Sequence, residues 1–91
     1  MPAAMDHQDT LAALRTRLTS LEPLSLKLTD ESHRHAGHAG AGQGGHFRVE
    51  IVAAVFAGKS TLARHRLVYD AAGDLMHGAI HALAIDARPP E

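Results

Sequence analysis

The chain has 91 residues, of which 45% are hydrophobic and 21% are charged, and its formal net charge at pH 7 is −1. This length suits one small domain with a layer of helix on a sheet, and the composition is typical of a soluble globular protein, not a disordered or membrane-spanning one. The absence of cysteine excludes disulfides, thiol nucleophiles and a self-sufficient thiolate cluster, and the near-neutral charge gives no general attraction to phosphate.

The first predicted helix covers Thr10 to Leu21, where leucines recur at spacings of three and four. We expect Asp9 or Thr10 to cap this helix and Pro23 to end it. Residues 24–29 then alternate leucine with polar residues, which predicts a strand with one buried face. The leucines expected on that face are Leu24, Leu26 and Leu28.

A glycine-, alanine- and histidine-rich segment, residues 32–45, is predicted to be a long mobile loop because it offers no apolar surface to bury. A longer strand is predicted from Phe47 to Ala57, with Phe56 also in the core, and we expect it to pair antiparallel with the first strand. Its inward residues are expected to be Phe47, Val49, Ile51, Ala53 and Val55.

The second predicted helix lies between Thr61 and Met76, with Ser60 or Thr61 as its cap and Gly73 weakening its last turn. Residues 80–87 form a last predicted strand, and the strand–helix–strand order favours a parallel, right-handed crossover. The apolar residues expected to share the buried face of this helix are Leu62, Val68, Tyr69, Ala72, Leu75 and Met76.

The predicted fold class is α+β, a single α-β-β-α-β domain whose three-stranded mixed sheet carries its helices on one face. We expect a flexible N-terminus over residues 1–8, the domain over 9–88 with its mobile loop at 32–45, and a tail at 89–91. The first nine residues lack a basic segment followed by an apolar one, so a cytoplasmic protein without a membrane segment is expected.

Two glycine-containing segments match nucleotide-binding patterns only superficially. Residues 40–45 fit the dinucleotide pattern, but a strand follows them instead of a helix. Residues 53–60 end in Gly-Lys-Ser between a strand and a helix, yet Ala53 replaces the first glycine and Val55 and Phe56 occupy the positions that would wrap phosphate. The interpretation is a hairpin connection in the first case and a turn with a helix cap in the second.

A small basic group lies at the second predicted helix. Lys59, Arg64 and Arg66 could meet phosphate oxygens, which would give a DNA-binding surface, although a solvated helix face has the same composition. His65 shares a side with Val68, so we expect a half-buried structural histidine there.

Histidine is the compositional outlier, with eight in the chain. Each loop histidine taken alone suits a solvated polar residue, but two histidine-bearing segments far apart in sequence are what a fold-assembled metal site requires. No paired general acid and base and no nucleophile with an aligned base stand out, so we expect neither an enzyme nor a small-molecule substrate. The histidines concerned are His33, His35 and His38 in the loop, His46 at the start of the second strand, and His77 and His81 before the third.

Five segments, in this order and spacing, resemble the BolA family over residues 9–90. They are residues 30–35 (DESHRH), 45–49 (GHFRV), 56–59 (FAGK), 64–69 (RHRLVY) and 80–85 (IHALAI).

The resemblance implies the α-β-β-α-β fold, which is similar to a class II KH domain, and with it nucleic-acid binding or transcription regulation in some members. The KH-type G-x-x-G loop lies between helices, whereas the match here, residues 37–40, lies in the hairpin loop. RNA binding by that route is therefore not expected.

More strongly, the resemblance implies a complex with a monothiol glutaredoxin of the Cys-Gly-Phe-Ser type that holds a 2Fe-2S cluster, with sulfur from the partner's cysteine and from glutathione. This chain would supply His81 and a loop ligand, which is His35 or His38 because the loop is longer than in short-loop members. Lacking cysteine, the chain falls in the histidine-loop type. The biological role can be delivery of the cluster or sensing of iron or redox state. The isolated protein can be a monomer or a weak homodimer.

A third hypothesis from the residues alone is a mononuclear metal carrier. It would use only the loop histidines and would bind zinc or nickel without any partner protein.

Overall fold

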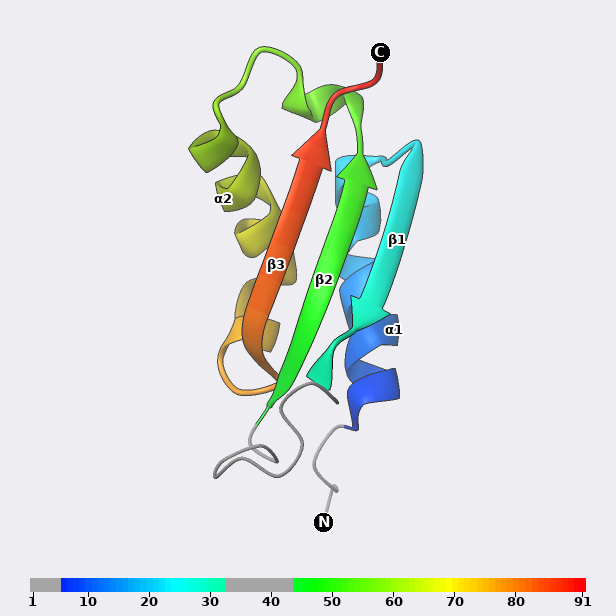
Figure 1. The fold of residues 1–91 in the computed structure, drawn as a ribbon, viewed down its shortest axis with the longest axis vertical. Helices are drawn as coiled ribbons and strands as arrows, with labels where there is room; N and C mark the ends of the chain where they lie inside the picture. The colour runs from blue at the N-terminus through cyan, green and yellow to red at the C-terminus, as the bar shows by residue number, and fades with distance from the viewer. Residues whose placement is uncertain (1–5, 33–43) are drawn as a thin grey trace.

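The computed structural model describes residues 6–32 and 44–91, which form a three-stranded sheet with two helices against one face (Figure 1). The predicted α+β order is confirmed. None of the helices in the described part has the length and hydropathy needed to cross a membrane. In chain order the elements are α1 (His7–Leu18), η1 (Thr19–Leu21), β1 (Ser25–Asp30), β2 (Gly45–Val52), η3 (Ala54–Phe56), α2 (Thr61–Ala72), η4 (Gly73–Met76) and β3 (Ile80–Arg88).

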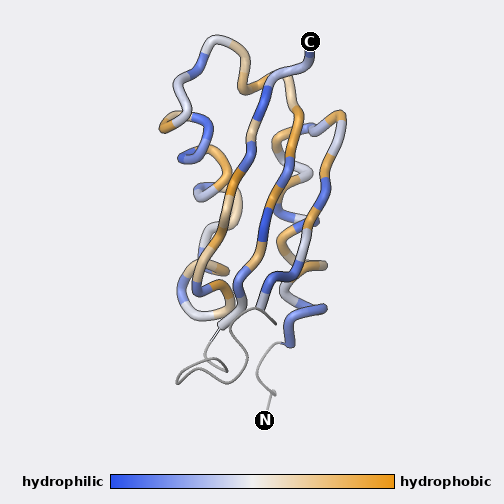
Figure 2. The backbone as a smooth tube through the Cα atoms, in the orientation of Figure 1, coloured by the Kyte–Doolittle hydropathy of each residue, from blue (hydrophilic) through white to orange (hydrophobic). Residues whose placement is uncertain are grey.

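The central strand of the sheet is β2, which pairs antiparallel with β1 and parallel with β3. Its side chains alternate between buried and half-buried along its whole length, as expected for a strand with one face against the helices. The hydropathy colours along β2 change with the same period (Figure 2). Both predicted pairings, the antiparallel hairpin and the parallel crossover through α2, are confirmed.

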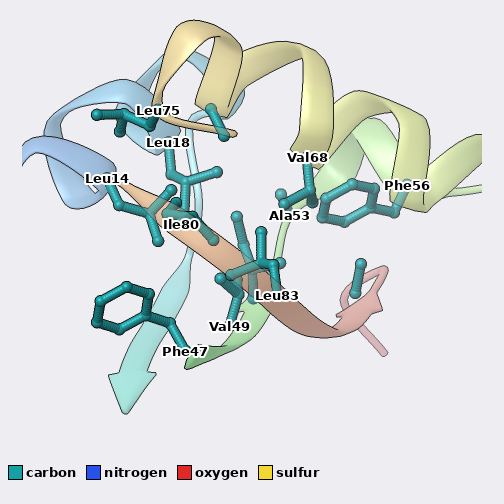
Figure 3. Packing of buried hydrophobic residues seen from close by; sticks show 13 residues of the cluster. Leu14, Leu18, Phe47, Val49, Ala53, Phe56, Val68, Leu75, Ile80 and Leu83 are labelled. Atoms are coloured by element: carbon teal, nitrogen blue, oxygen red, sulfur yellow. The ribbon is translucent and has the colours of Figure 1, made fainter. Parts of the chain in front are cut away.

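The hydrophobic core fills the space between the sheet and the two helices. Figure 3 shows Leu14 and Leu18 of α1 beside Ile80 of β3, and Phe56 beside Val68 of α2 toward the other end. Both phenylalanines are essentially buried, as the sequence predicts. Burial of a large apolar side chain stabilises the fold by about 1.5–3 kcal/mol, so these residues hold the helices on the sheet.

The predicted extension of the second strand to Ala57 is wrong. The chain leaves the sheet at Val52 and turns through η3, in which the Phe56 N–H donates to the Ala53 carbonyl at 3.2 Å. Side chains three residues apart in a 3₁₀ turn lie on the same side, which explains why Ala53 and Phe56 are both buried. Val55, expected to point inward, is instead 37% exposed.

The first helix begins earlier than predicted, because Asp6 is its cap. The Asp6 carboxylate accepts a hydrogen bond from the Asp9 N–H at 2.8 Å, so neither Asp9 nor Thr10 has that role. The helix thus begins at His7, within the segment 1–8 that was expected to be flexible, and residues 1–5 of that segment lie outside the described residues. Of the two caps predicted for the second helix, Ser60 and Thr61, Ser60 has this role, since its hydroxyl accepts from the Ala63 N–H at 3.1 Å.

Two leucines expected in the core are exposed. Leu24 is 72% exposed because it precedes β1, at the end of the sheet where the chain arrives from η1. Leu62 is 61% exposed, since six residues at 3.6 per turn separate it by roughly 240° from the buried Val68. Tyr69, next to Val68, is also 41% exposed.

One arginine of α1 holds the end of α2. The Arg17 guanidinium donates to the Ala72 carbonyl at 3.0 Å and pairs with the Asp74 carboxylate at 2.7 Å. A cation at these last carbonyls stabilises a helix C-terminus. Gly73 sits between the two with a φ of 56°, and a Cβ there would lie 3.0 Å from Arg17 Nη1. A glycine at this position therefore lets α1 and α2 join closely.

The Arg17–Asp74 pair predicts a pH-dependent contribution to stability. The hydrogen bond and charge of Arg17 lower the pKa of Asp74 below its ordinary 3.8, so the contribution is complete above that value and is lost as pH falls through the folded-state pKa. In urea unfolding at a series of pH values, wild type should exceed Asp74→Asn by a constant amount at neutral pH, and the difference should shrink below about pH 4. A difference that grows on acidification would contradict the pairing.

Candidate metal centre

The parallel pairing of β2 and β3 brings the first residues of both strands to the same end of the sheet (Figure 1). Gly45 pairs with Ile80 and His46 with Ala82, so the register shifts by one residue and His81 has no counterpart on β2. An extra residue of this kind redirects a side chain at a strand end. At this irregularity two consecutive residues of β3, His81 and Ala82, are both exposed, between the buried Ile80 and Leu83.

Two imidazoles meet at this end of the sheet. The ring centroids of His46 and His81 are 5.0 Å apart and their planes are inclined by 44°. His46 is half-buried and His81 exposed. The sequence prediction placed both residues at strand starts but selected only His81 as a ligand. The parallel pairing of the two predicted strands was the signal that could have identified His46.

The residues on both sides of the segment 33–43 contact this histidine pair, which we call the His46–His81 pair. On one side, the Ser32 hydroxyl accepts a hydrogen bond from the His46 N–H at 2.9 Å. On the other, a Cβ added to Gly44 would lie 3.3 Å from the His81 Cβ. The predicted ligands His35 and His38 lie outside the described residues, but the chain leaves and re-enters the described fold beside the pair.

Side chains of β1 and α1 support this end of the sheet. The Asp30 carboxylate accepts from the Ser32 N–H at 2.8 Å and lies 3.5 Å from His7 Nδ1. The His7 ring meets the Phe47 ring edge-on, with centroids 5.6 Å apart. The backbone around His46 is thus connected through Ser32 and Asp30 to the first turn of α1.

Within residues 6–32 and 44–91, no group of three or more histidine, aspartate and glutamate side chains is arranged to hold a metal ion. The described part therefore offers two imidazoles at one place, and any further ligand must come from water, from residues 33–43 or from a partner protein. His77, the other histidine near β3, lies close enough to Asp74 to help lower the pKa of that carboxylate.

The predicted basic group does not form one surface. Arg64 is half-buried, its Nη1 donates to the Ala87 carbonyl of β3 at 3.3 Å, and its buried Nε has no hydrogen-bond partner among the described residues. Lys59 and Arg66 are exposed and line a common hollow of about 350 Å³, together with Asp70 and an apolar floor. His65 is half-buried, as predicted.

Comparison with known proteins identifies the family. The family model for BolA-like proteins matches residues 18–91. The chain is also 48% identical over 80 residues to BolA-like protein 1 of Homo sapiens, an alignment that covers 87% of this chain and 57% of that protein. The chain belongs to the BolA family.

Other BolA proteins extend the comparison. The DNA-binding transcriptional regulator BolA of Escherichia coli (strain K12) is 36% identical over 66 residues, covering 72% of this chain and 61% of that one. The BolA domain of SufE1 from Arabidopsis thaliana has the same fold, with a TM-score of 0.76 and 40% identity over 87% of this chain and 90% of that chain. The chain spans less than two thirds of the length of the human and bacterial relatives.

Gly44 is predicted to be essential for the position of His81. At its φ of 123°, a Cβ would lie 2.7 Å from the Gly78 carbonyl oxygen in addition to its contact with His81. Gly44→Ala should lower the free energy of unfolding, measured in urea, for two reasons. The conformational strain should contribute about 1–2 kcal/mol and the steric clash about 1–3 kcal/mol. The substitution should also shift the His81 ring resonances in NMR spectra.

Gly78→Ala is the matched control. Gly78 has a similar φ of 135°, but a Cβ there meets nothing within 4 Å. Equal losses of stability in the two variants would show that the contact between Gly44 and His81 is unimportant.

Proposed function

We propose that this BolA protein is a non-enzymatic adaptor that binds a monothiol glutaredoxin of the Cys-Gly-Phe-Ser type and supplies histidine ligands to a shared 2Fe-2S cluster. The sulfur ligands would come from the partner's cysteine and from glutathione, because this chain has no cysteine. The biological role would be cluster trafficking or iron and redox sensing.

The position of His81 is the observation that carries the proposal. Its side chain is exposed at the end of the sheet, beside His46 and beside Gly44, which directly follows the segment 33–43. An outward imidazole fits a cluster shared with a second protein, whereas a buried one would not reach it. Neutral imidazole in place of thiolate is known chemistry for 2Fe-2S centres and raises their reduction potential.

The surrounding residues would orient this ligand. The extra residue in β3 directs His81 outward, and Gly44 allows the backbone to pass against it. The hydrogen bond from the His46 N–H to the Ser32 hydroxyl fixes the backbone just before the segment 33–43. The second ligand of this chain would be His35 or His38.

The complex with glutaredoxin tests the assignment of His81. After anaerobic co-purification with a monothiol glutaredoxin and glutathione, the mixed complex should show a visible absorption and circular dichroism spectrum typical of histidine ligation. His81→Ala should abolish that spectrum and leave the far-ultraviolet spectrum of the isolated protein unchanged, because the side chain is exposed.

His77→Ala is the matched control, since His77 is also exposed but lies near Asp74. A spectrum that survives His81→Ala would refute the ligand assignment. Replacing His35 and His38 separately decides the loop ligand, because only one of the two variants should change the spectrum.

A DNA-binding regulator is the alternative, and the similarity to the DNA-binding transcriptional regulator BolA of Escherichia coli is the observation that favours it. Lys59 and Arg66 would meet phosphates from the hollow at the start of α2. Arg64 is less suited, because its guanidinium already bonds to the Ala87 carbonyl. The apolar floor of the hollow and Asp70 also make it a poor phosphate surface.

Salt dependence of binding to duplex DNA tests this alternative. If Lys59 and Arg66 each neutralise one phosphate, replacing both by glutamine should reduce the slope of log affinity against log salt by about 1.8. Leu62→Gln, on the same hollow, is the uncharged control and should leave the slope unchanged. An unaltered slope in the double variant excludes this surface as the DNA contact.

A further inference from the structure

We propose that His46 and His81 form a binding site for one divalent transition-metal ion that requires neither a glutaredoxin nor the histidines of residues 33–43. This site shares His81 with the proposed cluster site but differs from it in its second ligand, His46, in its ion, and in needing protein ligands from one chain only. It also differs from a carrier built on the loop histidines alone.

The separation of the two rings fits ligation of a single ion. An ion about 2.1 Å from one nitrogen of each imidazole lies about 3.2 Å from the centre of each ring. If the nitrogen–metal–nitrogen angle lies between the octahedral and the tetrahedral value, the two ring centres are then about 4.5–5.2 Å apart. The observed separation is 5.0 Å, and the 44° inclination shows that the rings are not stacked face to face. Because His81 is exposed, turning its ring toward the ion displaces no core side chain.

The backbone under both rings is fixed before any ion binds. β2 and β3 are paired from Gly45 and Ile80 onward, so the two Cα positions belong to one sheet. The His46 N–H is bonded to Ser32 Oγ, and the His46 carbonyl accepts from the Glu31 N–H at 2.7 Å. A preformed pair of ligands loses little conformational entropy on binding.

The ligand set indicates which ions are suitable. Two neutral imidazoles with remaining positions open to water suit nickel, copper or zinc and do not suit magnesium or calcium, which prefer oxygen ligands. Nickel is the sharpest probe because it is paramagnetic in octahedral coordination and its water ligands complete that geometry. An ion on this pair would occupy His81 and thereby compete with any other use of that imidazole.

Calorimetric titration with NiCl₂ tests the proposal on the tag-free 91-residue chain carrying His33→Ala, His35→Ala and His38→Ala. One equivalent should bind in this background. His46→Ala or His81→Ala added to it should weaken binding at least about tenfold, since even loss of an outer-shell partner costs about that much. His77→Ala should leave the affinity unchanged.

Paramagnetic NMR on the same background keeps the test valid if His46→Ala fails to fold. The ring protons of His46 and His81 should broaden first, at substoichiometric nickel, and those of His7, His65 and His77 later. Loss of all binding in the triple loop variant, equal broadening of every histidine, or unchanged affinity in His81→Ala would each overturn the proposal.

The two proposals fail separately. The nickel titration contains no glutaredoxin, glutathione or cluster, so a negative result leaves the cluster assignment intact. Conversely, a cluster spectrum that survives His81→Ala refutes the cluster ligand without affecting the two-histidine site.

Discussion

The parallel pairing of β2 with β3 is the interaction on which the rest of the structure depends. Parallel strands need a crossover, and the crossover here is α2, which returns the chain to the end of the sheet where β2 began. The same return places His81 beside His46, although the two residues are far apart in sequence. One topological requirement thus produces both the helix layer and the histidine site.

The two helices stay on one face because the apolar residues of all three strands are directed there. Phe47 and Phe56 fill opposite ends of the core, and Arg17 connects the two helices at the end of α2 through the Ala72 carbonyl. The histidine site lies outside this core, at the end of the sheet, where His46 is half-buried and His81 is exposed. His81 can therefore face outward without leaving a gap in the core.

Much of the fold was predictable from sequence because the signals are local. Alternation along β2 depends on neighbouring residues alone and was predicted correctly, and Ser60 was one of the two caps predicted for α2. Two of the failures depend on tertiary geometry. The 3₁₀ turn that exposes Val55 follows from where the sheet ends, and the exposure of Leu62 follows from which side of α2 meets the sheet.

The candidate site was predictable only in part, for the same reason. His81 could be selected through the family resemblance, but its proximity to His46 depends on the register in which the parallel strands β2 and β3 pair, which no local pattern encodes. Likewise, the sequence predicted Arg64 to be part of a basic surface, but it did not show that the Arg64 guanidinium hydrogen-bonds to the β3 backbone. Long-range register and side-chain direction are the information that the sequence patterns lack.

Ser32 and Gly44 join the segment 33–43 to the fold mainly through main-chain groups and one hydroxyl. Both anchors belong to the described scaffold, and each one touches a histidine of the pair: Ser32 binds the His46 N–H, and Gly44 leaves room beside the His81 Cβ. A substitution at either anchor would therefore move an imidazole without removing it, so residues that carry no ligand atom set where the ligands stand.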